Sequence, residues 1–160
     1  MNDRTFRNAM GNFTTGVTVI TTETNGEIHG MTANAFMSVS MDPKLVVISV
    51  GDNASMLDKI KQSGNYAVNI LSNEQQDLSM HFAGQRETDK EIPFQTVRGV
   101  PVIEGAIAQI TCEVVSEHVE GDHTLFIGRV TDVQLEEHEP LVFFKGKYRT
   151  LSPIEETVKQ

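Results

Sequence analysis

Small and polar residues alternate with apolar ones between His29 and Ser40, where the chain reads HGMTANAFMSVS. Hydroxyl and amide side chains at this density suit a wall that hydrogen-bonds a flat polar ligand, whereas a purely structural loop more often carries Gly, Pro and charge. An ordinary polar strand edge explains the same composition equally well. The positions that would form such a wall are Gly30, Thr32, Asn34, Ser38 and Ser40.

An apolar, β-branched run, Leu45–Val50, follows and predicts a strand that is buried on both faces. The run leads into Gly51–Ser55, which we expect to open a short helix. The first turn of a helix offers unpaired backbone N–H groups and the positive end of a dipole, and this is a common seat for phosphate. Asp58 opposes this interpretation, because in a capping box with Ser55 it would bring negative charge to the same place. Nearby lysines in the sequence could offset that charge.

Two later segments carry side chains that could act on a ligand. His123 follows a Gly-Asp pair, so it lies either in a plain hairpin turn or at the rim of a sheet, over a ligand. Tyr148 lies among cations in the run Lys145–Arg149. A solvated hairpin explains this run, yet cationic and aromatic side chains also suit a dinucleotide, which has phosphates and stackable rings.

Motifs for several other chemistries are absent from the sequence. It contains no G-x-G-x-x-G, no G-x-x-x-x-G-K-[ST] and no G-x-S-x-G. The five histidines show no H-x-x-x-H spacing, and there is no C-x-x-C, so we expect no metal site. Cys112 has the parity of Ile110 and Val114 in an alternating run, which predicts a buried thiol rather than a nucleophile. A bound organic cofactor remains the leading option.

Length and composition predict one domain spanning residues 1–160. The net charge of −9 argues against non-specific binding to nucleic acid or to an anionic membrane. No apolar run is long enough to cross a membrane, and the first residues do not resemble a signal peptide. A single cysteine fits a reducing compartment, so we expect a cytoplasmic location.

The first half of the chain has clear start and stop signals. Residues 3–12 predict a short helix capped by Asp3, with Phe6, Met10 and Phe13 on one side. The Asn25-Gly26 pair predicts a two-residue hairpin turn. Other expected elements are a strand at Val17–Thr22, a helix from Ser55 that stops at Gly64, a strand at Tyr66–Leu71, and a helix opened by the capping box Ser72–Gln75 that reaches Phe82.

The second half predicts a polar loop or lid at Ala83–Val100, with at most a short helix, and long strands from Gly105 onward. A turn at Gly121-Asp122 leads into a strand at His123–Leu135, and Pro140–Leu151 supplies a final strand pair. Six or seven strands with only three short helices predict a closed antiparallel barrel or a sandwich with helices attached. A doubly wound parallel sheet is unsupported, because regular alternation of strands with long helices is missing.

Five segments, in this order, resemble the flavin reductase-like family, whose fold is the FMN-binding split barrel. The likeness spans nearly the whole chain. Within the family, the sequence most resembles the small reductase components of two-component phenol and 4-hydroxyphenylacetate monooxygenases. The segments are Phe13–Thr22 (F-x-T-G-V-T-V-I-T-T), His29–Ser40, Phe82–Gly84 (F-A-G), Gly121–Val130 (G-D-H-T-L-F-I-G-x-V) and Pro140–Tyr148 (P-L-V-F-F-K-G-K-Y).

The resemblance implies an antiparallel Greek-key split barrel and an NAD(P)H:flavin oxidoreductase. Such enzymes use NADH to reduce FAD or FMN and supply the reduced flavin to a separate oxygenase that hydroxylates an aromatic substrate. Family members are usually homodimers with the flavin sites near the subunit interface. Hydride transfer requires two rings stacked at reacting distance, and no strong base or nucleophile, which agrees with the residues present.

The resemblance also implies a role for particular residues of this chain. Met31, Thr32, Ala33 and Asn34 would contact the isoalloxazine ring, with Ser38 and Ser40 along the same wall. The remaining contacts would be the ribityl and phosphate residues Ser49, Gly51, Asn53, Ala54 and Ser55, the residues that close over the flavin, Phe82, Ala83 and Gly84, and His123 and Tyr148 near the nicotinamide dinucleotide.

His123 is expected to be a positioning group and proton donor rather than an obligatory catalyst, and Asp122 beside it would favour the charged imidazole. Two other functions stay open: a split-barrel flavoprotein that keeps its flavin bound and reduces another acceptor, and a non-enzymatic flavin-binding protein. The residues do not decide between FAD and FMN, between NADH and NADPH, or between release of the flavin and direct handover.

Overall fold

The computed structural model describes residues 1–155 and is mainly β-structure with antiparallel sheets. The elements of the first half are α1 (Asp3–Gly11), β1 (Thr15–Gly16), β2 (Thr18–Thr24), β3 (Glu27–Ala33), β4 (Phe36–Met41), β5 (Lys44–Gly51), α2 (Met56–Ser63) and β6 (Asn65–Ile70). The second half contains the 3-10 helix η1 (Asn73–Gln75), α3 (Gln76–Phe82), β7 (Phe94–Val97), β8 (Val100–Ile103), β9 (Ala108–Glu120), β10 (His123–Leu135), β11 (Val142–Phe144) and β12 (Lys147–Arg149).

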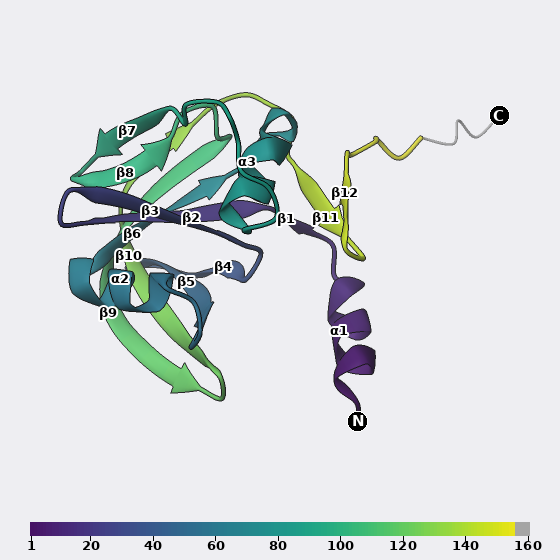
Figure 1. The fold of residues 1–160 in the computed structure, drawn as a ribbon, viewed down its shortest axis with the longest axis horizontal. Helices are drawn as coiled ribbons and strands as arrows, with labels where there is room; N and C mark the ends of the chain where they lie inside the picture. Colours follow the sequence, from purple (N-terminus) through teal and green to yellow (C-terminus); the bar gives the residue numbers. More distant parts are fainter. Residues whose placement is uncertain (156–160) are drawn as a thin grey trace.

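Seven strands form the main sheet, in the order β3-β2-β6-β9-β10-β5-β4 (Figure 1). Its edge strands β3 and β4 are consecutive in the chain and are separated only by Asn34 and Ala35. Such a link can span at most about 11 Å. The two edges of the sheet therefore come close together at this point, and Asn34 lies where they meet.

Local signals explain several boundaries. Asn25 and Gly26 both have positive φ, 54° and 74°, and join β2 to β3 with Thr24 opposite Glu27, as expected of an Asn-Gly hairpin turn. Gly64 ends α2 in the left-handed conformation, at φ 70°. Both predictions from the sequence are therefore confirmed, as is the capping box at Ser72 that opens η1 and α3.

Other expectations were wrong in part. Asn2, not Asp3, caps α1, because its side chain accepts the backbone N–H of Thr5. Ser55 makes no side-chain capping bond on α2, so the expected capping box with Asp58 does not form. The predicted loop at residues 83–100 contains β7, which pairs with β8. Twelve strands are present in residues 1–155 rather than six or seven, since several have only two to four residues.

The main core lies between the curled sheet and α2. Leu45–Val50 was predicted to be buried on both faces, but β5 alternates buried with half-buried positions, because one face packs on the core and the other is partly open. Cys112 is buried, as predicted. The largest buried side chains of this cluster are Ile20, Ile48, Ile60, Tyr66 and Phe126.

A small sheet of β1, β11 and β12 carries α1 away from the body of the protein (Figure 1). Phe6, Met10 and Phe13 lie on α1 and just after it, and they are 52%, 56% and 79% exposed. No residue of α1 is buried. The apolar side of this helix therefore has no packing partner within residues 1–155. Among the same residues, no helix is long and apolar enough to cross a membrane.

Candidate functional site: a hydroxyl-lined pocket at the meeting edges of the sheet

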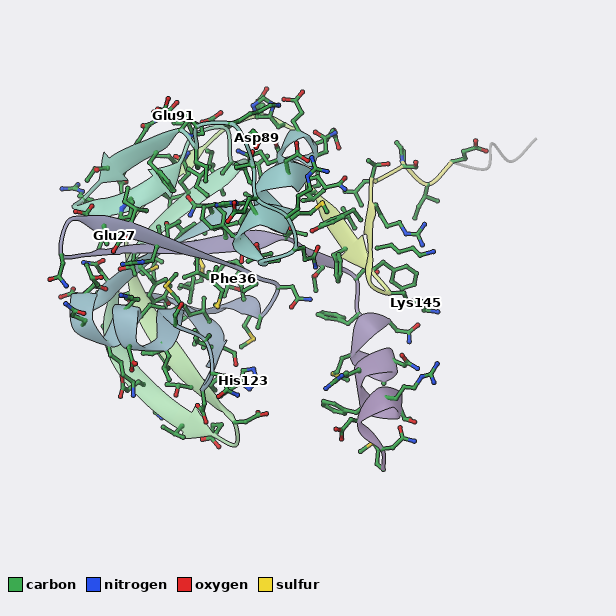
Figure 2. All side chains as sticks on the ribbon, viewed as in Figure 1. Glu27, Phe36, Asp89, Glu91, His123 and Lys145 are labelled. Carbon is green, nitrogen blue, oxygen red and sulfur yellow. The ribbon has the colours of Figure 1, made fainter. Side chains whose placement is uncertain are left out.

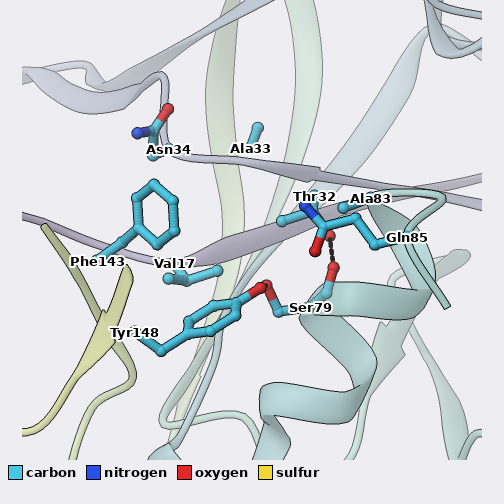
Figure 3. A pocket seen from close by; sticks show the side chains of 9 residues that line it. All are labelled: Val17, Thr32, Ala33, Asn34, Ser79, Ala83, Gln85, Phe143 and Tyr148. Atoms are coloured by element: carbon cyan, nitrogen blue, oxygen red, sulfur yellow. Dashed lines mark hydrogen bonds between the residues drawn. The ribbon is translucent and has the colours of Figure 1, made fainter. Parts of the chain in front are cut away.

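A pocket of about 170 Å³ opens beside the end of β3, between α3 and the β11–β12 hairpin (Figure 3). Four chain segments that are far apart in sequence contribute to it. The lining residues are Val17, Thr32, Ala33, Asn34, Ser79, Ala83, Gln85, Phe143 and Tyr148. None of them carries a carboxylate or a cation. The pocket therefore offers hydroxyl and amide groups to an uncharged ligand, without a strong base.

Ser79 connects three sides of this pocket. Its carbonyl oxygen accepts the hydroxyl of Thr32 at 2.6 Å, which ties α3 to β3. Its own hydroxyl lies 2.7 Å from the hydroxyl of Tyr148 on β12, in a hydrogen bond that either oxygen could donate. The Ser79 side chain is buried, at 1% exposed. This residue consequently fixes Thr32 and Tyr148 relative to one another.

Aromatic rings complete the wall opposite β3. Phe143 and Tyr148 are cross-strand partners on β11 and β12, and their rings meet edge to face at 5.5 Å between centroids. The turn between these strands uses positive φ at Lys145 and Gly146. The predicted final strand pair is thus confirmed, and it delivers the ring of Tyr148 to the pocket.

Phe82 lies behind the pocket rather than in its lining. A Cβ atom on Gly30 would come within 2.5 Å of the Phe82 ring, so only glycine fits here without a shift. Phe82 also contacts the rings of His81 and Phe94 edge to face. The close approach of Gly30 and Phe82 sets the spacing between β3 and α3, and with it the depth of the pocket.

A second group of predicted site residues lies at the tip of the β9–β10 hairpin, where Figure 2 labels His123, well away from Lys145 in the β11–β12 turn. His123 is opposite Gly51 in the β5–β10 register, and its ring lies 3.6 Å from where a Cβ of Gly51 would be. Its Nδ1 is 2.8 Å from Oδ1 of Asp122. The backbone N–H of Asp52 donates to the carbonyl of Asp122, so the loop after β5 is fastened to the histidine turn.

Backbone contacts join the two groups. The N–H of Ser49 on β5 donates to the carbonyl of Ala35 at 3.2 Å, and the N–H of Phe36 donates to the carbonyl of Asn34. Gly51 lies two positions after Ser49 on the same strand, a distance of about 7 Å. The edge of the pocket at Asn34 therefore continues along β5 to the loop beside His123.

The structure brings together some of the residues predicted from the sequence. Thr32, Ala33, Asn34, Ala83 and Tyr148 line the pocket, and Gly51 meets His123 at the other end. The other predicted residues lie outside the pocket lining: Met31 packs against the main core, Ser38 and Ser40 lie on β4, Ser49 lies on β5, Asn53, Ala54 and Ser55 lie in the loop before α2, and Phe82 and Gly84 flank Ala83.

Four pocket residues were not predicted as site residues: Val17, Ser79, Gln85 and Phe143. Val17 and Phe143 were interpreted only as strand residues. Ser79 lies in the middle of a short helix, where nothing in the local sequence distinguishes it from a solvent-facing serine. The other three had a signal in the family resemblance, since Val17 and Phe143 lie inside two of its segments and Gln85 follows the F-A-G segment at Phe82–Gly84 by one residue.

Hydrogen bonding and burial move three pKa values. His123 lowers the pKa of Asp122, first through the side-chain hydrogen bond and then through its charge. Burial raises the pKa of the Cys112 thiol to about 12 and raises that of the neighbouring Tyr66 hydroxyl above its ordinary value. Cys112 and Tyr66 therefore stay protonated inside the core and take no part in the site.

A family model described as "Flavin reductase like domain" matches residues 10–152. The chain therefore belongs to the flavin reductase-like family, and the resemblance inferred from its motifs is confirmed. A relative from Rhodococcus sp., named NADH-dependent flavin reductase, is 45% identical over 91% of this chain and 84% of its own length. The reductase component of 4-hydroxyphenylacetate 3-monooxygenase from Thermus thermophilus is 37% identical over 91% of this chain and 95% of its own length.

Solved structures agree with this assignment. The flavin reductase PheA2 superposes with a TM-score of 0.93 and 62% sequence identity, over 96% of this chain and all of that one. The NADH:FAD oxidoreductase SgcE6 from Streptomyces globisporus, solved in complex with NAD and FAD fragments, has a TM-score of 0.87 and 35% identity, covering 94% of both chains. The predicted mainly β, antiparallel fold is likewise confirmed.

Proposed function

We propose that this protein is an NADH-dependent flavin reductase, which reduces FAD or FMN by hydride transfer and supplies the reduced flavin to a partner aromatic monooxygenase. The pocket carries the proposal: it is uncharged, lined by hydroxyl and amide groups, and bounded by two aromatic rings. The names of the relatives support the same chemistry, since they include NADH-dependent flavin reductases and a monooxygenase reductase component.

The pocket fits a flavin ring. Thr32, Asn34 and Gln85 present groups that can hydrogen-bond ring heteroatoms, and the small side chains of Ala33 and Ala83 leave room for a flat surface. A flavin held here would supply the hydride acceptor, with NADH as the donor. The residues of the chain have only to hold two rings in register and keep water out, which is consistent with the absence of a general base from the lining.

The loop after β5 fits a phosphate tail. Ser55 leaves its hydroxyl free of any capping bond on α2, so both this hydroxyl and the positive end of the helix can serve a ligand. Asp58 stays in the first turn of α2, but no capping box with Ser55 draws its carboxylate back to the start of the helix. In this proposal the ribityl chain runs past Ser49 and Gly51, and Asn53, Ala54 and Ser55 surround the phosphate.

His123 is the proposed positioning group near the nicotinamide. Its Nδ1–H donates to the ionised Asp122, which leaves Nε2 to face a ligand beside Gly51. In the imidazolium form Nε2 donates a hydrogen bond or a proton, and in the neutral form it accepts one. The remaining proposed contacts come from the family pattern: Met31, Ser38 and Ser40 along the wall, and Phe82, Ala83 and Gly84 over the ring.

The finer fold assignment is also a proposal. We infer that residues 1–160 act as a single split-barrel domain of Greek-key type. The support is the seven-stranded sheet whose two edges are joined by Asn34 and Ala35 alone. Such a short link forces the sheet to curl toward closure and leaves the gap between its edges for a ligand.

A homodimer is proposed on separate grounds. Phe6, Met10 and Phe13 expose an apolar side of α1, and Met37 and Met41 are exposed on the edge strand β4. The three neighbouring apolar side chains on and just after α1 are typical of an interaction surface. The oxygenase that would take the reduced flavin is a second proposed partner, and the cytoplasmic location stays a prediction from the single cysteine.

Anaerobic mixing with NADH and excess FAD or FMN tests the function. A flavin reductase bleaches the band of oxidised flavin, near about 450 nm, over many equivalents of free flavin. Bleaching of a single equivalent would instead indicate a flavoprotein that retains its flavin for another acceptor. No bleaching, with flavin still bound in a titration, would indicate a non-enzymatic binding protein. Crossing each flavin with NADH and NADPH would decide the preferences that the sequence leaves open.

A further inference from the structure

We infer that Ser79 is a positioning residue that turns the Tyr148 hydroxyl into a hydrogen-bond donor for the ligand in the pocket, aimed at a carbonyl oxygen of a flat heterocycle. The inference rests on the proposed function, because flavin and nicotinamide each carry such a carbonyl. Its evidence is the hydrogen bonding of one buried serine, which neither the motifs nor the family resemblance singled out.

The first step is the proton of the Ser79 hydroxyl. Ser79 is 1% exposed, so this proton needs an acceptor within the protein. A serine in a helix often donates to the carbonyl one turn earlier, but within residues 1–155 the Ser79 hydroxyl has no partner other than the Tyr148 hydroxyl, at 2.7 Å. The arrangement that satisfies both groups is the one in which Ser79 donates and Tyr148 accepts.

The second step is what Tyr148 can then do. A phenol has one proton, and Tyr148 does not use it on Ser79 in this arrangement. Tyr148 is half-buried and lines the pocket, and no other hydrogen bond engages its hydroxyl within the described chain. Its O–H is therefore free to donate into the pocket, and Figure 3 shows the Tyr148 hydroxyl oxygen beside Ser79. The edge-to-face contact with Phe143 limits the positions that the ring can take.

The third step concerns Thr32 on the opposite wall. Its hydroxyl donates to the Ser79 carbonyl, which also accepts the backbone N–H of Ala83. Thr32 has thus spent its proton and can only accept from a ligand. Ser79 gives the pocket one acceptor on β3 and one donor on β12. This polarity suits a ring edge that carries an N–H and a C=O, which both isoalloxazine and a carboxamide provide.

A double-mutant cycle tests the inference. In Tyr148→Phe the donor is lost, and we expect the affinity for the ligand to fall about fivefold to tenfold, the usual effect of one hydrogen bond to a neutral group. In Ser79→Ala the tyrosine keeps its hydroxyl but loses its fixed orientation, so a smaller fall is expected. In Ser79→Ala/Tyr148→Phe the serine change should add nothing, because Ser79 acts through Tyr148.

Two measurements identify the ligand whose carbonyl accepts the hydrogen bond from Tyr148. Fluorescence titration gives the dissociation constants of oxidised FAD and FMN, and steady-state rates give KM and kcat for NADH. A rise in the flavin constants alone assigns the donor to the flavin carbonyl, and a rise in KM for NADH alone assigns it to the nicotinamide carboxamide. If neither value changes in Tyr148→Phe, the inference is overturned.

Matched controls separate positioning from folding. Tyr66→Phe removes the hydroxyl of the only other tyrosine, which bonds the carbonyl of Phe126 inside the core, and Ser63→Ala removes a bonded serine at the end of α2. Both should lower the melting temperature without changing ligand affinity. If Ser79→Ala weakens binding equally with and without the Tyr148 hydroxyl, Ser79 is merely structural. If the parent protein itself does not reduce flavin, the proposed function is refuted instead.

Discussion

The proposed flavin site has two ends that differ in burial and charge. The pocket end is the pocket beside β3, and the histidine end is formed by His123 and the loop after β5. At the pocket end Ser79 is buried, its two hydrogen bonds tie α3 to β3 and β12, and no charged side chain lines the wall. At the histidine end the side chains of Asp122 and His123 are 95% and 48% exposed, and their pairing is open to water. The first is an uncharged surface fixed by buried hydrogen bonds, and the second is a solvated, charged one.

The difference indicates what each end can discriminate. Buried hydroxyls with fixed partners distinguish ligands by the pattern of donors and acceptors, because a mismatched polar group there goes unpaired. Exposed charges distinguish little, since water and salt screen them. We therefore expect the identity of the ring to be determined at the pocket, and the loop beside His123 to contribute affinity for any ligand with a phosphate.

The largest predicted effect contrasts one glycine from each end. In Gly30→Ala the new methyl group would lie 2.5 Å from the Phe82 ring, and overpacking of this kind costs about 1–3 kcal/mol. In Gly51→Ala the methyl would lie 3.6 Å from the His123 ring, an ordinary contact, so a change within about 0.5 kcal/mol is expected. Urea unfolding of both variants measures the difference. Equal stability would mean that the pocket end is no more rigid than the histidine end.

A smaller effect is expected from charge at the phosphate seat. In Ser55→Asp a carboxylate replaces the free hydroxyl at the start of α2, and repulsion should cost FMN and FAD binding about 1 kcal/mol, or roughly fivefold in Kd. Riboflavin is the matched control ligand because it lacks phosphate, so its affinity should stay the same. If all three ligands weaken together, or none does, the phosphate does not bind in this loop.

The sequence predicts well the features that neighbouring residues determine. The Asn25-Gly26 turn, the left-handed stop at Gly64 and the capping box at Ser72 each depend on a few consecutive residues, and all three form as expected. The alternation around Cys112 likewise gave its burial correctly. The capping box at Ser55 failed although its residues match, because Ser55 has helical backbone angles, φ −60° and ψ −25°, whereas a capping serine needs an extended conformation.

The pocket could be predicted only in part, because distant segments assemble it. Thr32 and Asn34 were found because their polar pattern is visible in neighbouring residues at the end of β3, and Ala33 was implied only by the family resemblance. Ser79 was missed because its partners, on β3 and β12, lie 47 and 69 residues away in the sequence. β7 was also missed: it has four residues and pairs only with β8, so tertiary context rather than pattern determines it.

The affinities of an Asn34→Ala variant for different flavins should distinguish the pocket end from the phosphate seat. Replacing Asn34 with alanine removes an amide at the rim of the pocket, and the loss of about one hydrogen bond should raise Kd threefold to tenfold. The rise should be the same for riboflavin, FMN and FAD, which is the opposite of the pattern expected for Ser55→Asp. A loss that appears only with FMN and FAD would move Asn34 from the ring to the phosphate.

The smallest effect concerns the charged pair at the histidine end. Because the folded protein lowers the pKa of Asp122, the ionised carboxylate stabilises the fold above the pKa that this group has in the unfolded chain, and this contribution disappears as the pH falls through the lower folded value. Asp122→Asn should therefore have a slightly lower melting temperature than the parent at neutral pH, and the two curves should converge in acid. The side chain is exposed, so the difference should be small.

An NMR titration of the Asp122 carboxyl measures its pKa directly, and His123→Ala is the matched control. In that variant the largest cause of the shift, the hydrogen bond from Nδ1, is gone, so the pKa should return toward its ordinary value. A pKa that stays low without His123 would show that the backbone of the turn holds the carboxylate. The hydrogen bond between Nδ1 of His123 and Asp122 would then orient the imidazole without being needed to keep the carboxylate ionised.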